Sequence, residues 1–270
     1  MKNVRIAVAI MNSPFGQIEH NLNQIAALAK EASQKKAALI CFPEMNITGY
    51  HNGQDIYNIA QPIPGPVTEQ ISFLSKSYQI TIISGLAETD SEKIFMTQII
   101  SKPDGSISKY RKIHPGPSEF NISAGDSIII EKEQWGTYGV QLCYDSHFPE
   151  LSTIMAIQGV DMIFIPHASP HGTSENKYNS WMRHLTARAY DNSVYIVACN
   201  QTGKNHKGLT FPGIALVIDP SGYVVEKMVK DKEGLLFVDI KSDCLTNVRN
   251  HRMKYFLPNR RPEIYRSMIV

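Results

Sequence analysis

The order of strand-like and helix-like segments constrains the fold of this chain more than any other feature of its sequence. A β-rich run over residues 4–10 precedes apolar side chains that recur at helical spacing over 18–32, and the two patterns continue to alternate. The strand-like segments 94–100 and 107–112 then flank Pro103-Asp104-Gly105, a turn sequence, and predict a hairpin. A hairpin is not expected in a purely parallel doubly wound sheet, so the pattern favours an α/β sandwich of two sheets with helices outside.

The rest of the chain contains the same two kinds of segment. Predicted strands cover 37–42, 80–86, 127–130, 138–143, 160–166, 194–199, 213–218 and 235–240, and predicted helices cover 67–78, 149–158 and 176–190. The last two strands are expected on either side of the turn Pro220-Ser221-Gly222. Because we find no internal repeat, low-complexity tract or linker, we expect a single domain over residues 1–270.

Charge and hydrophobicity limit the partners that this protein can have. Hydrophobic residues make up 43% and charged residues 19% of the 270 residues, which is typical of a globular chain with a sizeable core. The net charge is only +2 and the basic residues are scattered, so neither a nucleic-acid interface nor a polybasic membrane anchor is expected. We therefore expect a small-molecule partner.

The N-terminus and the cysteines favour a cytoplasmic protein. Arg5 interrupts the first apolar run and no small-residue cleavage site follows it, so this run is interpreted as a strand and not as a signal peptide. No apolar stretch approaches the length that spans a bilayer. The four cysteines, Cys41, Cys143, Cys199 and Cys244, are widely spaced in a chain large enough to fold without disulfides. A reducing cytoplasm and no membrane association are the expectations.

Three reactive side chains each end a strand-like run. Cys143 ends the apolar run that starts at Tyr138, where a thiol is held rigidly and can be polarised by backbone N–H groups, although a lone cysteine is often buried for packing alone. Glu44 follows a wholly apolar strand and Pro43, where an unpaired carboxylate would be costly. Lys112, at the end of the 107–112 segment, is the obvious partner. Since α/β sheets collect their chemistry at one edge of the strands, we expect the three to converge.

The segments around these residues resemble the signature segments of a known family. They are Phe42-Pro43-Glu44 with Gly49-Tyr50, Tyr110-Arg111-Lys112-Ile113-His114, and Gly139-Val140-Gln141-Leu142-Cys143-Tyr144-Asp145 with Phe148-Pro149-Glu150. In order and spacing they are similar to those of the nitrilase superfamily of carbon–nitrogen hydrolases. The likeness continues through Arg188-Ala189-Tyr190-Asp191-Asn192, Asp219-Pro220-Ser221-Gly222 and Arg260-Arg261-Pro262-Glu263-Ile264-Tyr265, and so covers almost the whole chain.

The resemblance implies a fold, an assembly and a mechanism. The fold is a four-layer α-β-β-α sandwich, usually paired in a homodimer or a higher homo-oligomer. Glu44 would take the thiol proton, Cys143 would attack the carbonyl or nitrile carbon, and Lys112 with the Tyr144 backbone N–H would hold the atom that gains charge. Ammonia or an amine would leave, and water would cleave the thioester, with neither metal nor cofactor.

Further site residues follow from the resemblance and from position. Relatives often carry a second glutamate where Glu119 lies in Pro115-Gly116-Pro117-Ser118-Glu119, so Glu119 is expected to position the substrate or the attacking water. The residues expected to shape the substrate pocket are Tyr50, Tyr144, His167, Ser169, His171 and Trp181. The chain ends soon after Tyr265, whereas nitrile hydrolases of the family tend to be longer, so a small amide is the expected substrate.

Several alternatives remain open at this stage. A nitrile hydrolase or an N-carbamoyl amine amidohydrolase would use the same three residues, and a catalytically silent binding or scaffold homologue would keep only the fold. A Cys-His hydrolase is disfavoured because the local signatures of such enzymes are absent around Cys143. A metal site at His167 and His171 is disfavoured because Pro170 breaks the helix that would align them. An acyl-transferring subunit would need an extra domain or membrane segments.

Overall fold

The first of two six-stranded sheets is formed mainly by the N-terminal half of the chain. The computed structural model describes residues 1–266. In spatial order this sheet consists of β14 (Gly234–Ile240), β1 (Val4–Ile10), β2 (Leu39–Cys41), β3 (Thr81–Asp90), β4 (Lys93–Ser101) and β5 (Ile107–Arg111). The strands β1, β2 and β3 are parallel, and the outer pairs are antiparallel. The predicted hairpin of 94–100 and 107–112 is confirmed as β4 and β5.

The second sheet is formed by the C-terminal half. Its spatial order is β13 (Val224–Val229), β12 (Ile214–Ile218), β9 (Tyr195–Asn200), β8 (Met162–His167), β7 (Gly136–Val140) and β6 (Ile130–Glu133). Here β7, β8 and β9 are parallel and the remaining pairs are antiparallel. A two-stranded ribbon, β10 (Gly203–Lys204) and β11 (Thr210–Phe211), lies outside both large sheets.

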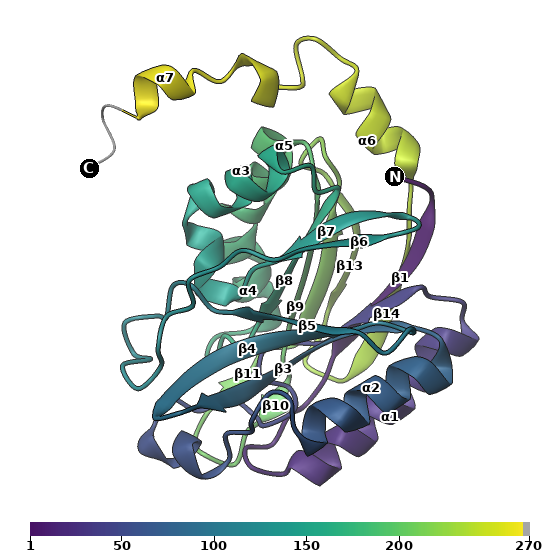
Figure 1. Ribbon diagram of the computed structural model, residues 1–270. Helices are drawn as coiled ribbons and strands as arrows, with labels where there is room; N and C mark the ends of the chain where they lie inside the picture. The colour runs from purple at the N-terminus through teal and green to yellow at the C-terminus, as the bar shows by residue number, and fades with distance from the viewer. Residues whose placement is uncertain (267–270) are drawn as a thin grey trace.

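Helices cover the outer face of each sheet, and the inner faces pack together (Figure 1). The first sheet is covered by α1 (Ile18–Gln34) and α2 (Pro66–Tyr78), and the second by α3 (Pro149–Ile157), α4 (Ser174–Trp181) and α5 (Leu185–Asn192). Buried side chains from both sheets, including Val8, Cys41, Phe164 and Val197, form one core between them. The expected α-β-β-α sandwich is therefore confirmed.

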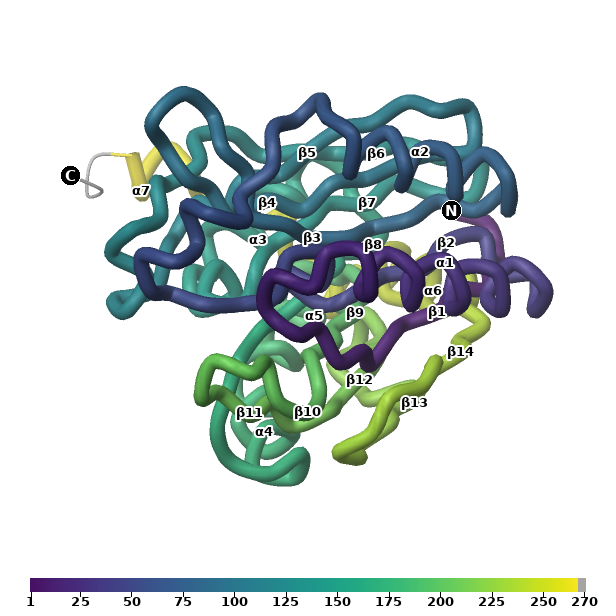
Figure 2. Tube along the Cα trace, turned by 90° about the horizontal axis from the view of Figure 1, so that it is seen from below, coloured from purple at the N-terminus to yellow at the C-terminus, as the bar shows by residue number. Residues whose placement is uncertain are grey.

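The last strand of the chain, β14, pairs with the first strand, β1. Figure 2 shows β14 beside β1, and the two strands pair antiparallel from Val4 with Ile240 to Ile10 with Gly234. After β14 come α6 (Ser242–Arg249) and α7 (Pro262–Tyr265), which belong to a C-terminal segment that extends away from the sheets in Figure 1. Arg249 anchors the start of this segment, because its guanidinium pairs with Asp161 at 2.8 Å.

The single helix predicted over 176–190 is wrong, because the structure divides this stretch into α4 and α5. Backbone hydrogen bonds from Arg183 to Ser180 and from His184 to Trp181 span only three residues, so the helix tightens there and ends. Trp181 and Leu185 are both buried against the second sheet on either side of the break. The apolar pattern continues across the break, and this is why periodicity alone did not reveal it.

The last two predicted strands are real, but they are not neighbours across a turn. The turn Pro220-Ser221-Gly222 joins β12 to β13, a strand that the sequence analysis missed, and β14 crosses to the first sheet. The missed strand, β13, is an exposed edge strand that carries Glu226 and Lys227. Such charged residues interrupt the apolar pattern by which a strand is recognised, and they protect the edge from pairing with another chain.

Two smaller shifts affect the segment around Cys143. The strand predicted at 127–130 lies instead at 130–133, and the strand predicted over 138–143 ends at Val140. Cys143 opens a short 3-10 helix, Cys143–His147, which we call the Cys143 turn. Pairing between β7 and β8 ends with Val140 and Phe164, so the backbone beyond is free to turn.

Candidate active site

Glu44 and Lys112 meet at one edge of the sandwich, as the sequence analysis expected. Glu44 follows β2 and Lys112 directly follows β5, and both side chains are only 1% exposed. The ammonium Nζ of Lys112 donates a hydrogen bond of 3.0 Å to Oε1 of Glu44. A buried ion pair requires further hydrogen bonds to compensate for its lost hydration, and the neighbouring residues supply them.

Glu119 is the second carboxylate at the same ammonium. Lys112 Nζ lies 2.9 Å from its Oε1 and 2.8 Å from its Oε2. The Tyr50 hydroxyl donates to Oε1 at 2.9 Å, and the Gly116 N–H donates to Oε2 at 2.6 Å. Lys112 is thus held between Glu44 and Glu119, and both carboxylates are buried.

The position of Glu44 is set from both sheets. Its Oε2 accepts a hydrogen bond of 2.9 Å from the Ala168 N–H, just past the end of β8, and its backbone oxygen accepts one of 2.7 Å from the Gln201 side chain. The carboxylate is therefore oriented by strand ends of the second sheet as well as by Lys112. A rigidly held carboxylate of this kind can act on one defined neighbour.

The Cys143 turn holds its first residue in an unusual conformation. Cys143 has a φ of +39°, in the left-handed region that residues with a side chain rarely adopt, and the residue is partly exposed. The Ser146 hydroxyl donates to the Cys143 carbonyl at 2.7 Å, and the Arg188 guanidinium donates to the Ser146 carbonyl at 3.0 Å. Strained backbone of this kind, held by surrounding contacts, is common at functional sites.

Asp145 anchors the Cys143 turn to the strand end that carries Lys112. Its side chain is fully buried and accepts hydrogen bonds of 2.8 Å from the Tyr110 hydroxyl, 3.0 Å from the Leu142 N–H and 2.8 Å from the His114 N–H. The ring nitrogen Nδ1 of His114 lies 2.8 Å from the same carboxylate. Since Tyr110 and His114 flank Lys112 in the sequence, Asp145 couples the thiol-bearing turn to the lysine.

The charges of this cluster act on one another and on the thiol. Burial raises the pKa of the Glu44 carboxyl to about 7, although the Lys112 ammonium opposes this shift. Burial alone would lower the pKa of Lys112, but the carboxylates of Glu44 and Glu119 hold that pKa well above its usual value. Burial and the charge of Glu44 raise the pKa of the Cys143 thiol, against the opposing effect of Lys112. At neutral pH the resting site thus holds a protonated thiol and a charged lysine.

This arrangement can carry out nucleophilic chemistry. A thiol that stays protonated needs a base, and a carboxyl with a pKa near neutrality is suited to take a proton and return it. The Lys112 ammonium, held in place before any reaction, can stabilise negative charge that develops on a substrate atom. The site therefore combines a nucleophile, a base and a fixed positive charge.

The six residues predicted to shape the substrate pocket fall into three groups. Tyr50 and Tyr144 belong to the cluster, the former through Glu119 and the latter by its place beside Cys143 in the turn. His167 and Trp181 are buried and pack on each other, with ring centroids 4.3 Å apart. Burial lowers the pKa of His167 well below its usual value, so its ring is neutral.

Ser169 and His171 lie in the loop between β8 and α4. Ser169 accepts a hydrogen bond of 2.7 Å from the ammonium of Lys177, and its N–H donates to the Asn200 side chain at 2.8 Å. His171 is exposed and contacts Thr210 through its backbone. Roles in substrate binding remain predictions for all six residues.

Asp145, Lys177 and Arg188 also contact this site, and no role was predicted for them from the sequence. Asp145 was visible inside a signature segment, and its place two residues after the cysteine was an available signal. Lys177 and Arg188 lie on helices beyond the loop, where a basic residue is most often an ordinary surface group. Arg188 does open one of the segments that carry the family resemblance, although no role was predicted for it, and no sequence pattern pointed to Lys177.

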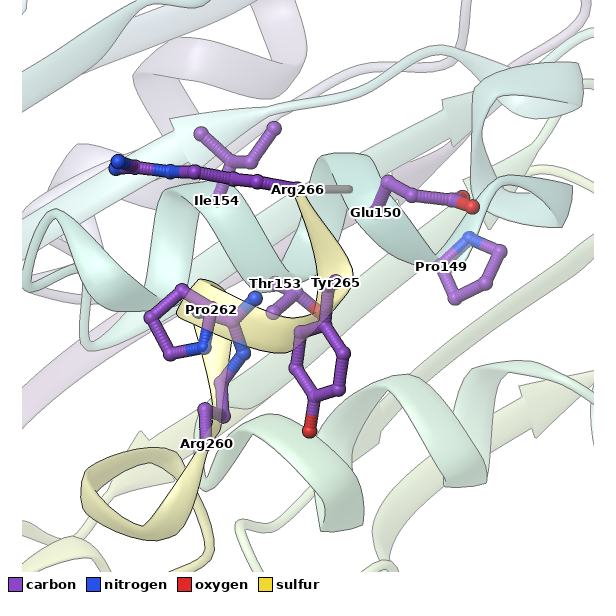
Figure 3. A pocket seen from close by; sticks show the side chains of 8 residues that line it. All are labelled: Pro149, Glu150, Thr153, Ile154, Arg260, Pro262, Tyr265 and Arg266. Carbon is purple, nitrogen blue, oxygen red and sulfur yellow. The ribbon is translucent and has the colours of Figure 1, made fainter. Parts of the chain in front are cut away.

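One further cavity lies away from this cluster, in the part of the chain that the structure describes. Within residues 1–266 no group of three or more His, Cys, Asp or Glu residues could hold a metal ion, and no helix is long and apolar enough to cross a membrane. A cavity of about 480 Å³ lies between α3 and the C-terminal segment, where Figure 3 shows Ile154 from the helix and Pro262 and Tyr265 from the segment. None of the predicted site residues lines this cavity.

Comparison with known proteins gives a consistent result. A family model described as carbon-nitrogen hydrolase matches residues 5–250. The omega-amidase of Xenopus tropicalis is 31% identical over 85% of this chain and 86% of that protein, and a probable nitrilase of Schizosaccharomyces pombe is 28% identical over 98% of both. An amidase from Nesterenkonia shares the fold, with a TM-score of 0.85 and 23% identity over 98% of this chain and 97% of that chain. In another structure of that amidase, the acetamide moiety of fluoroacetamide is covalently attached to its active-site cysteine.

Proposed function

The chain belongs to the carbon–nitrogen hydrolase family, and on that premise we propose that it hydrolyses the C–N bond of a small non-peptide amide through a thioester on Cys143. The observation that carries the proposal is the Lys112 ammonium, held between Glu44 and Glu119 in a cluster whose charges act on the Cys143 thiol. Relatives named omega-amidase and (R)-stereoselective amidase support an amide substrate, and relatives named nitrilase are the reason that the test below includes nitriles.

In the first half of the proposed reaction the amine is released. The Glu44 carboxylate takes the thiol proton as Cys143 Sγ attacks the carbonyl carbon of the amide. The oxygen that gains negative charge is held by the Lys112 ammonium and by the backbone N–H of Tyr144. Glu44 then gives its proton to the nitrogen, the C–N bond breaks, and ammonia or an amine leaves a thioester behind.

In the second half water replaces the amine. Glu44 takes a proton from the water molecule as the water oxygen attacks the thioester carbon. The C–S bond then breaks, Glu44 returns the proton to the sulfur of Cys143, and the carboxylic acid is released. Glu119 keeps Lys112 in place through its two contacts and is the proposed orienting group for substrate or water. Full turnover in a Glu119→Gln variant would reject that role.

A cysteine substitution series tests the proposed function. We expect Cys143→Ala to lower ammonia release from small amides by roughly a thousandfold or more, because the nucleophile is lost. Cys143→Ser should keep only slight activity, since a serine hydroxyl is much harder to deprotonate than a thiol. The matched control is Cys244→Ala, a free cysteine on α6, which should retain activity.

The outcomes separate this proposal from its alternatives. Circular dichroism establishes that each variant is folded, and a panel of amides, N-carbamoyl amines and nitriles identifies the bond that is cleaved. Unchanged amide turnover in folded Cys143→Ala would overturn the mechanism. No turnover of any compound by the wild-type protein would favour a binding or scaffold homologue instead.

We also propose that two copies of the chain pair through the helical layer that contains α3. The family resemblance implies such a homodimer. Ile154 of α3, which lines the cavity of Figure 3, is 41% exposed, and Ile157 of the same helix is 50% exposed. Apolar side chains gathered in this way are typical of an interface. Sedimentation should give twice the chain mass, whereas a monomer at assay concentration would contradict the proposal.

A cytoplasmic location is proposed on the state of the cysteines. All four are free, and Cys41 and Cys199 are buried in the core between the sheets without forming a disulfide. Free thiols suit a reducing compartment. Recovery of the protein in the membrane or extracellular fraction of its cells would contradict this location.

A further inference from the structure

Three side chains at alternate positions of one segment reach the candidate site. Tyr110 belongs to β5, and Lys112 and His114 follow this strand. Alternate residues of an extended chain point to the same face. The Lys112 ammonium contacts Glu44 at 3.0 Å, whereas Tyr110 and His114 both contact Asp145 at 2.8 Å. The proposed reaction gives a task to Lys112 but none to His114.

His114 contacts the middle of the Cys143 turn through Asp145. Its ring nitrogen Nδ1 lies 2.8 Å from Oδ1 of Asp145, and its backbone N–H donates to the same oxygen at 2.8 Å. A carboxylate only accepts hydrogen bonds, so Nδ1 carries the proton in this contact. The other oxygen of Asp145 accepts from the Leu142 N–H at 3.0 Å. Through Asp145, His114 therefore acts on the residue that precedes Cys143.

The ring of His114 also contacts the end of the Cys143 turn. It stacks on Phe148, with the ring centroids 3.7 Å apart and the planes at 10° to each other. The Phe148 ring meets the Tyr144 ring edge-on, with centroids 5.5 Å apart. Tyr144 directly follows Cys143 and supplies the backbone N–H that is proposed to hold the charged oxygen. The contacts of one side chain thus lead to both neighbours of Cys143, which are Leu142 and Tyr144.

We propose that His114 is a positioning residue for the reaction. It holds the Cys143 turn so that the thiol and the Tyr144 N–H face the substrate carbonyl together. This inference rests on the proposed function. The turn needs such support, because its first residue has a positive φ. A donor that is aimed at the oxygen only in the transition state raises kcat and leaves KM unchanged, so the loss of His114 should affect kcat.

Two substitutions separate the hydrogen bond of His114 from its ring. His114→Phe keeps a flat ring against Phe148 but removes the side-chain donor to Asp145. His114→Asn keeps a donor close to the position of Nδ1 but removes the ring. For a small amide we expect His114→Phe to lower kcat by about 10- to 100-fold, the range of one hydrogen bond to a charged group, and to change KM less than about twofold. His114→Asn should recover part of the loss in kcat.

A double substitution tests whether His114 acts through Asp145. Both His114→Phe and Asp145→Asn weaken the same group of hydrogen bonds, so their effects should not be independent. We expect the loss of kcat in the double variant to be clearly smaller than the product of the two single losses. A loss equal to that product would overturn the path through Asp145.

Two controls separate positioning from stability. His20→Phe, at an exposed position of α1, should keep the kcat and the KM of the wild-type protein. Val8→Ala, in the core between the sheets, should lower the urea midpoint but leave kcat unchanged. The inference is overturned, and the proposed function stands, if folded His114→Phe keeps its kcat, if its loss lies in KM alone, or if Val8→Ala loses as much kcat.

Alkylation of Cys143 by iodoacetamide is a readout that does not require turnover. Mass spectrometry of the peptide that contains Cys143 gives its rate. His114→Phe should slow this reaction about threefold or more, because a misplaced thiol attacks less readily, and His20→Phe should leave the rate unchanged. If the wild-type protein hydrolyses no amide, the proposed function falls, and the alkylation rates still test His114. Equal rates in wild-type protein and His114→Phe would overturn its role in positioning the thiol.

Discussion

The Glu44 carboxyl shows how the surroundings of one residue decide its chemistry. In water this group would be ionised at neutral pH. In the protein, burial and the nearby charge of Glu119 raise its pKa to about 7, although the Lys112 ammonium acts to lower that pKa. A base with a pKa near the working pH balances proton uptake against proton return. The same carboxylate can therefore serve both halves of the proposed reaction.

This raised pKa predicts the pH dependence of activity. The proposed base acts in its deprotonated form, so kcat/KM for a small amide should be lost below a pH of about 7 and present above it. Glu119→Gln removes a negative charge that raises the pKa of Glu44, and the acidic limb should then move to lower pH. The measurement is the pH profile of ammonia release.

The readout is the pH at which kcat/KM falls to half of its maximum on the acidic side. The height of the profile is not used, because Glu119→Gln is also expected to lower the maximal rate. Glu69→Gln, an exposed glutamate on α2, is the control and should leave the limb in place. If the limb in Glu119→Gln coincides with that of the wild-type protein, a group other than Glu44 sets the profile.

The sequence was most informative for residues that follow a recognisable strand. Glu44 and Lys112 were predicted to meet because each ends a readable strand, and the structure joins them at 3.0 Å. Lys177 could not be predicted in the same way. Its contact with Ser169 depends on the course of the loop after β8, and no local pattern encodes that course.

At the scale of elements, the Cys143 turn depends on one buried carboxylate. Asp145 accepts from Tyr110, Leu142 and His114, and these contacts tie the turn to the end of β5. A turn whose first residue has a positive φ needs such support, because the backbone alone would relax to a more favourable conformation.

Asp145→Asn tests this support. The amide keeps the size of the side chain but replaces an acceptor oxygen by a donor, so at least one buried hydrogen bond is lost. We expect the free energy of unfolding to fall by about 3 kcal/mol, since hydrogen bonds to a buried charge are strong. The rate at which iodoacetamide alkylates Cys143 should fall as well, because the thiol is no longer held in place.

The matched control is Asp104→Asn, in the exposed turn between β4 and β5, where Asp104 accepts from Ser106 at 2.8 Å. That change should alter the free energy of unfolding by less than about 1 kcal/mol and leave the alkylation rate unchanged. A loss of stability in Asp145→Asn without any change in alkylation would show that Asp145 supports the fold and not the thiol.

The sequence predicted most elements but not how they are joined. Strands such as β8 and β9 are uniformly apolar and buried, so their pattern is unambiguous. The division between α4 and α5 and the crossing of β14 to the first sheet depend on tertiary packing instead. Local periodicity carries no information about which sheet receives a strand.

At the scale of the whole molecule, the two sheets are built alike. Each has three parallel strands in its centre, one antiparallel strand on one side and two on the other. The carboxyl ends of the central strands of the two sheets meet where the Ala168 N–H, after β8, donates to Glu44, after β2. The candidate site is thus a product of both halves, and neither half contains it alone.

This shared construction supports the prediction of a single domain, which is testable by unfolding. Both tryptophans, Trp135 and Trp181, pack against the second sheet, so their fluorescence reports on that half. Val8 lies on β1 of the first sheet, in the core that both sheets share. We expect Val8→Ala to lower the free energy of unfolding by about 2 kcal/mol and to shift the tryptophan transition by the same amount.

Such a shift is expected if the two halves unfold together, because Val8 lies on β1 of the sheet that contains no tryptophan. The transition in urea should be single, and circular dichroism and fluorescence should have the same midpoint at one protein concentration. The control is Val225→Ala on β13, where the side chain is 43% exposed. It should shift the urea midpoint by less than about a quarter of the shift expected for Val8→Ala. If the fluorescence midpoint of Val8→Ala equals that of the wild-type protein while circular dichroism shows an earlier transition, the halves unfold separately and the chain has two domains.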